Sequence, residues 1–122
     1  MKANEMSILG IPVKHVTVTV AADGTITCAP DPVSVTSKNA LIAFNLATDG
    51  YSFPDTDAIV INTANSDFPY ESWTIKPQLA GIADLCKILG QTKYTVTVVD
   101  DATGQSYSLD PVIHNGNGTP TP

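Results

Sequence analysis

Residues 93–112 read KYTVTVVDDATGQSYSLDPV, and this stretch decides the fold of the chain. Apolar and polar side chains alternate over 94–99 and again over 106–109, which is typical of strands with one buried face. Between them lies a four-residue loop whose last residue is glycine. This loop pairs Asp100 with Gln105, so we predict an antiparallel hairpin in which paired residue numbers sum to 205.

The predicted register separates the hairpin into an apolar face and a polar face. The apolar face carries the pairs Tyr94–Pro111, Val96–Leu109 and Val98–Tyr107. The polar face carries Lys93 and Asp110 on neighbouring strands, where they are diagonal neighbours. Diagonal Cβ atoms lie about 7–8 Å apart, which a lysine side chain can span. Contact between Lys93 and Asp110 is therefore feasible.

The rest of the chain carries further strand patterns separated by turn signals. Two of these signals, Asp23-Gly24 and Asp49-Gly50, are typical of hairpin turns. Besides the last hairpin, the predicted strands lie at 16–20, 25–28, 33–35, 40–46, 58–61 and 73–75. Residues 82–89 have helical spacing and Gly90 as a stop, so they predict one short helix. The expected fold is all-β, an antiparallel β-sandwich of the immunoglobulin-like or jelly-roll-like kind.

Length and composition predict one globular domain spanning 1–122, with a flexible polar tail over 116–122. Hydrophobic residues make up 43% of the chain and charged residues 15%. The net charge is −6, and the six lysines are scattered with no arginine, which argues against nucleic acid and anionic membrane partners. No run approaches the roughly 18 apolar residues of a membrane span. The start of the chain lacks a signal-peptide pattern, so we expect a cytoplasmic protein with Cys28 and Cys86 reduced.

The Asp110-Pro111 linkage is the feature of the last hairpin that carries chemistry. An aspartate side chain can attack its own main-chain carbonyl, and the basic prolyl nitrogen leaves well once it is protonated. The same dipeptide is also common in inert turns. Two interpretations follow, a chain that cuts or crosslinks itself and an inert fold with a Lys93–Asp110 ion pair.

The residues of this region resemble the DP-EP family of small bacterial β-sandwich proteins, which is named for its Asp-Pro and Glu-Pro dipeptides. The resemblance runs from about Val16 to Asn115 and is carried by 93–98, Asp101, Thr103-Gly104, Tyr107, Asp110-Pro111, Ile113 and Asn115. Residues 30–33 (PDPV) occupy the position of the second motif, with Asp31 where a glutamate is expected.

The resemblance implies an aspartic-peptidase-like activity in which the chain cleaves itself after the aspartate of the late Asp-Pro. By the motif match these residues are Asp110 and Pro111, and the substrate is the chain itself. The resemblance also implies an isopeptide crosslink between a lysine and this aspartate. The lysine corresponds to Lys93 by its position on the preceding strand.

The chemistry can also use a second carboxylate as general base or acid. Candidates are Asp31, Asp49, Asp55 and Asp57, which the sequence does not rank. His114 is a candidate proton donor to the leaving nitrogen, or a surface histidine. Crosslinking needs a neutral Lys93, and only burial lowers the pKa of a lysine toward neutrality.

The remaining patterns predict no cofactor and no metal ion. The two histidines and two cysteines lack the close spacing of a copper site after the late cysteine. Residues 51–54 and 68–70, which precede Trp73, could line a binding groove or anchor loops. The alternative function is therefore a non-catalytic module that binds a protein partner. The sequence does not indicate an oligomeric state.

Overall fold

The computed structural model describes residues 11–63 and 65–116, and in them the chain is all-β. The strands are β1 (Val13–Val20), β2 (Ile26–Ala29), β3 (Val33–Val35), β4 (Ala40–Leu46), β5 (Tyr51–Ser52), β6 (Ile59–Ile61), β7 (Trp73–Lys76), β8 (Leu79–Asp84), β9 (Gly90–Asp100), β10 (Ser106–Leu109) and β11 (Val112–Asn115). All eight strands that the sequence predicts are present, and β5, β8 and β11 were not predicted. No helix long and apolar enough to cross a membrane occurs in the described residues.

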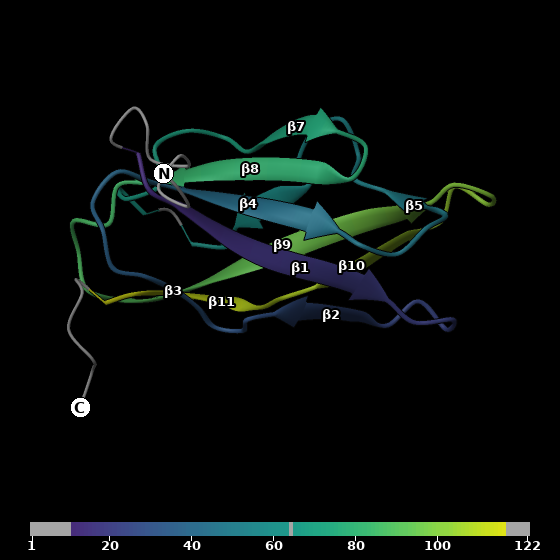
Figure 1. Cartoon of the computed structure of the whole chain (residues 1–122), viewed down its shortest axis with the longest axis horizontal. Helices are drawn as coiled ribbons and strands as arrows, with labels where there is room; N and C mark the ends of the chain where they lie inside the picture. Colours follow the sequence, from purple (N-terminus) through teal and green to yellow (C-terminus); the bar gives the residue numbers. More distant parts are fainter. Residues whose placement is uncertain (1–10, 64, 117–122) are drawn as a thin grey trace, which may run out of the picture.

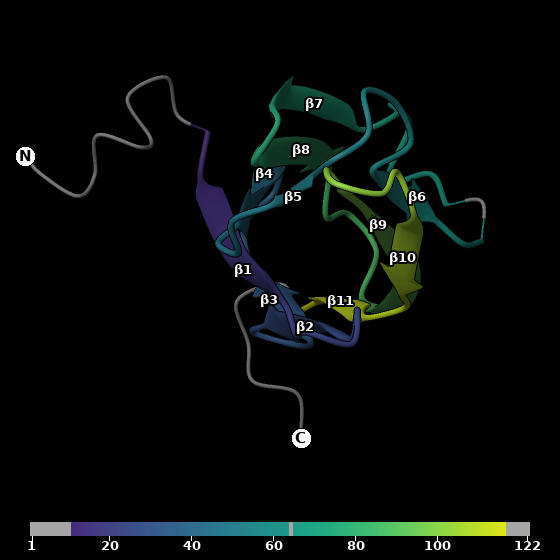
Figure 2. The same cartoon turned by 90° about the vertical axis from the view of Figure 1, so that its right-hand side faces the viewer.

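The strands form two mixed sheets that face each other (Figure 1). One sheet has the order β2-β1-β4-β8-β7. In the other, β9 carries β10 and β11 along one edge and β5 and β6 along the opposite edge, while β3 lies beyond β11. The end-on view in Figure 2 shows that the two sheets do not close into one barrel.

The prediction of a purely antiparallel sheet arrangement was wrong, because two strand pairs are parallel. β1 runs parallel to β4, with Val16 beside Phe44. β11 runs parallel to β3, with Ile113 beside Val33. The second of these pairs joins residues about eighty positions apart, and it places the segment before β3 next to the segment before β11.

The two sheets share one apolar core. Tyr94, Val96 and Val98 of β9 are fully buried and belong to the same cluster as Phe44 of β4. The Phe44 and Tyr94 rings lie 5.4 Å apart at 59°, a tilted contact between the two sheets. Alternate residues of β9 are buried as predicted, so the hydrophobic pattern fixes which face of this strand points inward.

The helix predicted over 82–89 was wrong. Residues 79–84 instead form β8, which pairs with β4 and β7 and buries Ala80, Ile82 and Asp84 on one face. Cys86 then adopts φ 55°, a left-handed conformation that cannot continue a helix. The helical spacing spanned only about two turns, which is too short to form without tertiary support. Pairing with two neighbouring strands supplies more hydrogen bonds.

The tail begins later than the sequence suggested. Gly116 is buried, and its N–H donates to the carbonyl of Val35 at 2.8 Å. This bond extends the parallel pairing of β11 with β3 by one residue. The remainder of the predicted tail, 117–122, lies outside the described residues.

Candidate functional site

The Asp110-Pro111 bond lies at the junction between β10 and β11 (Figure 1). Both strands pair with β9 in one continuous register, with Leu109 opposite Val96 and Val112 opposite Lys93. This is the predicted register, and it is confirmed. Proline has no N–H for the ladder, which explains why the strand is interrupted here. The junction stays attached to β9 because the Tyr94 N–H donates to the Pro111 carbonyl at 3.0 Å.

The two residues of the bond face opposite sides of the sheet. Pro111 is buried on the core side with Tyr94, and Asp110 is exposed on the outer side. The sequence predicted this division from the hairpin register. The scissile bond is therefore held on both sides, by the buried Pro111 ring on the core side and by a polar network around Asp110 on the outer side.

The polar network fixes the Asp110 carboxylate. Thr95 Oγ1 lies 2.7 Å from Asp110 Oδ1 and 2.7 Å from the side-chain oxygen position of Asn62. A hydroxyl has one proton and can donate to only one of these acceptors. An ionised carboxylate can only accept, so Thr95 donates to Asp110 and Asn62 turns its amide N–H toward Thr95. The chain of donors runs from Asn62 through Thr95 to Asp110.

Asp31 also reaches this junction. Its Oδ1 accepts a hydrogen bond from the backbone N–H of Val112 at 3.0 Å, across 81 positions of sequence. The parallel pairing of β3 with β11 causes this contact, because Asp31-Pro32 lies just before β3 and Asp110-Pro111 just before β11. The Pro111 nitrogen lies one residue upstream of Val112 N, or roughly 3.3 Å along the strand. The two Asp-Pro dipeptides thus meet at one place in the fold.

Lys93 lies on the outer face with Asp110, as predicted, but the two side chains do not pair. Lys93 is opposite Val112, whereas Asp110 is at the level of Thr95, which occupies its carboxylate. In the described part of the chain no ion pair joins Lys93 to Asp110. Lys93 is exposed, so nothing in these residues desolvates its ammonium group. The burial that a nucleophilic lysine needs is absent from the described chain.

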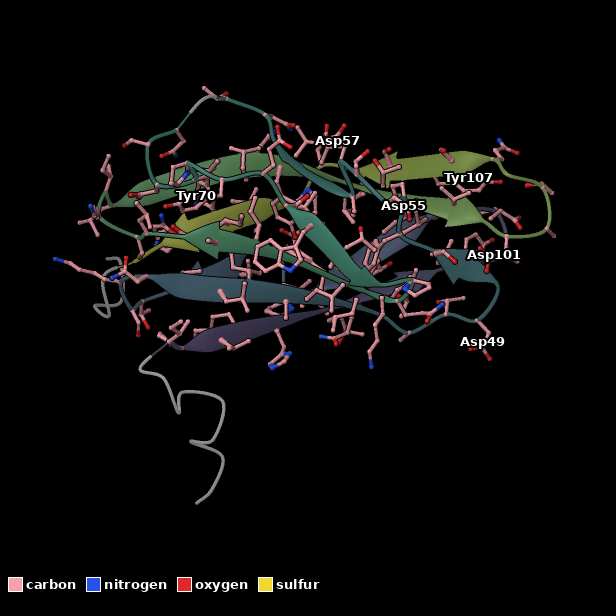
Figure 3. The ribbon with its side chains drawn as sticks, turned by 90° about the horizontal axis from the view of Figure 1, so that it is seen from above. Asp49, Asp55, Asp57, Tyr70, Asp101 and Tyr107 are labelled. Carbon is pink, nitrogen blue, oxygen red and sulfur yellow. The ribbon has the colours of Figure 1, made fainter. Side chains whose placement is uncertain are left out.

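The other candidate residues lie away from the junction. Asp49 lies in a turn that is hydrogen-bonded to the far end of the last hairpin, through Asp101 N and Gly50 O. Asp55 and Asp57 lie between β5 and β6, near the other edge of β9. Figure 3 shows Asp49, Asp55 and Asp101 toward the same end of the molecule.

His114 lies on β11, opposite Gln91. It is three residues beyond Pro111, which corresponds to roughly 10 Å along an extended strand. Its imidazole is therefore not positioned to protonate the Pro111 nitrogen directly. Among the carboxylates that the sequence left unranked, Asp31 is the one that contacts the junction.

The core side of the junction contains a buried phenol and a buried thiol. Tyr94 is fully buried, and its hydroxyl lies beside the Cys28 thiol without a hydrogen bond of regular geometry. Burial raises the pKa of Cys28 to about 11, and burial likewise raises the pKa of Tyr94 above its ordinary value. Both groups therefore stay neutral in the apolar core.

A second polar cluster, which the sequence did not indicate, lies at the other end of β11. The side-chain amide of Asn115 donates to Asp67 Oδ2 and to Asp84 Oδ1, each at 3.1 Å. Asp67 also accepts the N–H groups of Lys87 and Ile88, each at 3.0 Å. All three residues of the cluster are buried. It ties β8, β11 and the segment after β8 together.

Asp84 has the unusual protonation behaviour in this cluster. The pKa of Asp84 is raised from 3.8 to about 6, because burial and, to a smaller degree, the nearby Asp67 carboxylate outweigh the hydrogen bonds from Cys86 and Asn115. Asp84 Oδ2 has no hydrogen-bond partner among residues 11–63 and 65–116. In the sequence, the sign of this cluster was Asp84, which lies within residues 82–89. The predicted helix placed Asp84 away from the apolar face of the helix. Over residues 11–63 and 65–116, no three His, Cys, Asp or Glu side chains are placed to share a metal ion.

A scan against protein-family models and a search of curated proteins find no match to this chain.

Proposed function

We propose that this chain is an autoproteolytic, aspartic-type peptidase that cleaves its own Asp110-Pro111 bond. The observation that carries the proposal is the hydrogen bond from Val112 N to Asp31, which places a second carboxyl group beside a bond that is already prone to break. The anchored carboxylate of Asp110 supports it. The resemblance to the DP-EP family points to the same bond, and the two facing sheets fit the β-sandwich that it implies.

The first step forms a cyclic anhydride. An Asp110 carboxylate oxygen bonds to the main-chain carbonyl carbon of Asp110, and the bond from that carbon to the Pro111 nitrogen breaks. The leaving nitrogen takes a proton from the Asp31 carboxyl group. Asp31 Oδ1 already accepts the hydrogen bond from the Val112 N–H, so Oδ2 is the oxygen that carries this proton.

The second step consumes water. A water molecule adds to the anhydride, and the Asp31 carboxylate takes up the proton that the water releases. Asp110 then carries both its side-chain carboxyl group and a new α-carboxyl group, and Asp31 is again protonated. A two-carboxylate cycle of this kind uses one residue as nucleophile and one as acid and then base.

The fold contributes mainly by orientation. Hydrogen bonds hold the Asp110 carboxylate and the Pro111 carbonyl on opposite sides of the bond. A well-oriented intramolecular attack can gain roughly 7–11 kcal/mol relative to a bimolecular one.

An isopeptide crosslink is the second outcome of the same anhydride. The Lys93 amine would attack in place of water and form an amide with Asp110. Water has the advantage in the isolated chain because Lys93 is exposed. A partner that covered this face would desolvate Lys93 and favour the crosslink.

Intact-mass spectrometry in denaturing solvent tests the proposal. Purified protein is incubated over a range of pH, and cleavage is expected to release a fragment that begins at Pro111. The rate should rise as the solution enters the range in which carboxyl groups bind protons, since the leaving nitrogen needs one. A crosslinked product would have a large fragment lighter by one water than the hydrolysed fragment.

Matched variants distinguish the proposed role of Asp110 as nucleophile from that of Asp31 as proton donor. Asp110→Ala removes the nucleophile and should stay intact. Asp31→Asn keeps an acceptor for Val112 N but carries no transferable proton, so it should slow cleavage by about 10²–10⁴-fold, the usual contribution of general acid–base catalysis. Asp49→Asn, at a remote turn, should cleave at the parent rate. A single uncut mass at every pH would end the proposal.

The alternative function is a non-catalytic module that binds a protein partner. Exposed hydrophobic side chains on and before β7 favour it, since Tyr70 is 64% exposed and Trp73 is 42% exposed. An uncut chain that binds a partner through this side would support the alternative.

A further inference from the structure

A cavity of about 280 Å³ lies between β6 and the segment that leads into β7. Ile59, Phe68 and Ile82 line it and are buried, so they form an apolar floor. These residues come from both sheets and from the segment between them. None of the residues proposed for self-cleavage lines this cavity.

The rim of the cavity is apolar and exposed. Val60 is 41% exposed and Tyr70 is 64% exposed, although both belong to the lining. Figure 3 labels Tyr70 and Asp57, which lie at separate places along the long axis of the molecule. Clustered exposed apolar side chains around a cavity are typical of a binding site.

The charges of the cavity are all negative. Asp57 and Glu71 line it, and no lysine does. Within the described residues neither carboxylate has an ion-pair partner. The Ser72 hydroxyl, which also lines the cavity, accepts the Ile59 N–H at 3.3 Å. The net charge of −6 adds a general attraction for cations.

We propose that this cavity binds a lysine or arginine side chain of a basic, apolar peptide. The aliphatic stem of such a side chain would pack on the apolar floor, with its charged head at the carboxylates. Tyr70 offers a ring face for a cation–π contact. The cavity volume of about 280 Å³ lies at the small end for ligand pockets, which usually measure about 300–1,000 Å³, and it can hold one long side chain.

Charge complementarity separates this occupant from the alternatives. A neutral sugar would use the aromatic ring and hydrogen bonds but would not need two carboxylates. A purely apolar peptide would leave both carboxylates desolvated and unpaired, which costs free energy. Only a cationic group satisfies the floor and the rim together.

Two peptides that differ only in charge test the proposal by nuclear magnetic resonance. The isotope-labelled full chain is titrated with Ac-Val-Arg-Val-NH2 and with its neutral citrulline analogue. Saturable shifts of the Val60, Tyr70 and Glu71 amides are expected with the arginine peptide, and markedly weaker binding is expected with the analogue. Added salt should weaken the arginine complex, because the carboxylates are near the surface.

Single-residue variants test whether the arginine peptide binds at the carboxylates of this cavity. Asp57→Asn and Glu71→Gln should each weaken arginine-peptide binding by roughly two- to fivefold, as expected for partly exposed charge pairs. Asp49→Asn is the control and should leave the affinity unchanged. Equal binding of the two peptides, saturable binding of the disaccharide maltose alone, or no saturable shift would each overturn the proposal. The Asp110→Ala variant should bind normally, so this result is independent of self-cleavage.

Discussion

At the residue scale, an exposed pair of carboxyl groups and a buried pair show how the same side chain differs with its surroundings. Asp110 and Asp31 lie at the surface and contact polar hydrogens around one peptide bond. Asp84 is buried with Asp67 close by, and desolvation keeps it protonated to higher pH. We propose the first pair for self-cleavage, whereas the second pair holds strands together through hydrogen bonds.

The Asp84→Asn variant tests the buried cluster through its pH dependence. The folded pKa of about 6 lies above the unfolded value of 3.8, so wild-type stability from this group is complete below pH 4 and is lost as the pH rises through 6. The loss amounts to about 3 kcal/mol, by roughly 1.4 kcal/mol per pKa unit. The variant lacks this loss, so its stability relative to the parent should rise between pH 4 and 7.

Urea denaturation at a series of pH values measures this difference. The Asp110→Asn variant is a suitable control because Asp110 is exposed. Parallel pH profiles for the parent and Asp84→Asn would contradict the raised pKa of Asp84.

At the element scale, turns determine how the strands of different sheets approach each other. Gly24 has φ 89° and is buried in the turn between β1 and β2. A Cβ atom at this position would collide with the Tyr107 ring of β10, so the glycine serves both turn geometry and ring packing. The ring also meets Tyr51 of β5, with centroids 6.4 Å apart in an edge-on contact.

Gly24→Ala is therefore expected to destabilise the fold by roughly 1–3 kcal/mol, because it combines a left-handed backbone with a steric overlap. Adding Tyr107→Ala should recover part of the overlap cost, which a double-mutant cycle in urea would measure. Gly104→Ala has the same backbone strain with open space around it, so it separates strain from overlap. Equal losses for Gly24→Ala and Gly104→Ala would show that the ring contact contributes nothing.

The strands and their pairing also explain which parts of the fold and of the candidate site could be predicted from the sequence. The alternation in 93–112 predicted the last hairpin, its register and the opposite facing of Asp110 and Pro111, because these depend on local pairing. This alternation could not rank Asp31 above the other candidate carboxylates, because the contact of Asp31 with Val112 depends on parallel strand pairing across 81 positions. The strand β8 was misread because its apolar spacing suits a short helix as well as a strand with two neighbours.

At the scale of the whole molecule, the two sheets enclose both thiols. Cys28 belongs to β2 and Cys86 follows β8, and both are buried and reduced. Burial raises the pKa of Cys28 to about 11, so little thiolate exists near neutral pH.

Alkylation of the native protein with iodoacetamide at pH 8 should therefore be slow at both cysteines. Labelling should become complete in denaturing urea, and mass spectrometry of digests would locate it at each position. If both thiols depend on global opening, their native labelling should slow together when the urea concentration is lowered. Rapid labelling of Cys28 in native buffer would contradict its burial beneath the junction.

The position of β11 has a consequence for detecting a cut. This strand is hydrogen-bonded to β9 on one side and to β3 on the other, with Ile113 fully buried and Asn115 in the buried cluster. A break before Pro111 would leave the released peptide seated in the sheet as a non-covalent strand. The nicked protein would migrate as one particle in gel filtration and would separate only when unfolded. Refolding would then require two chains to meet, so the cut would convert a concentration-independent folding reaction into a concentration-dependent one.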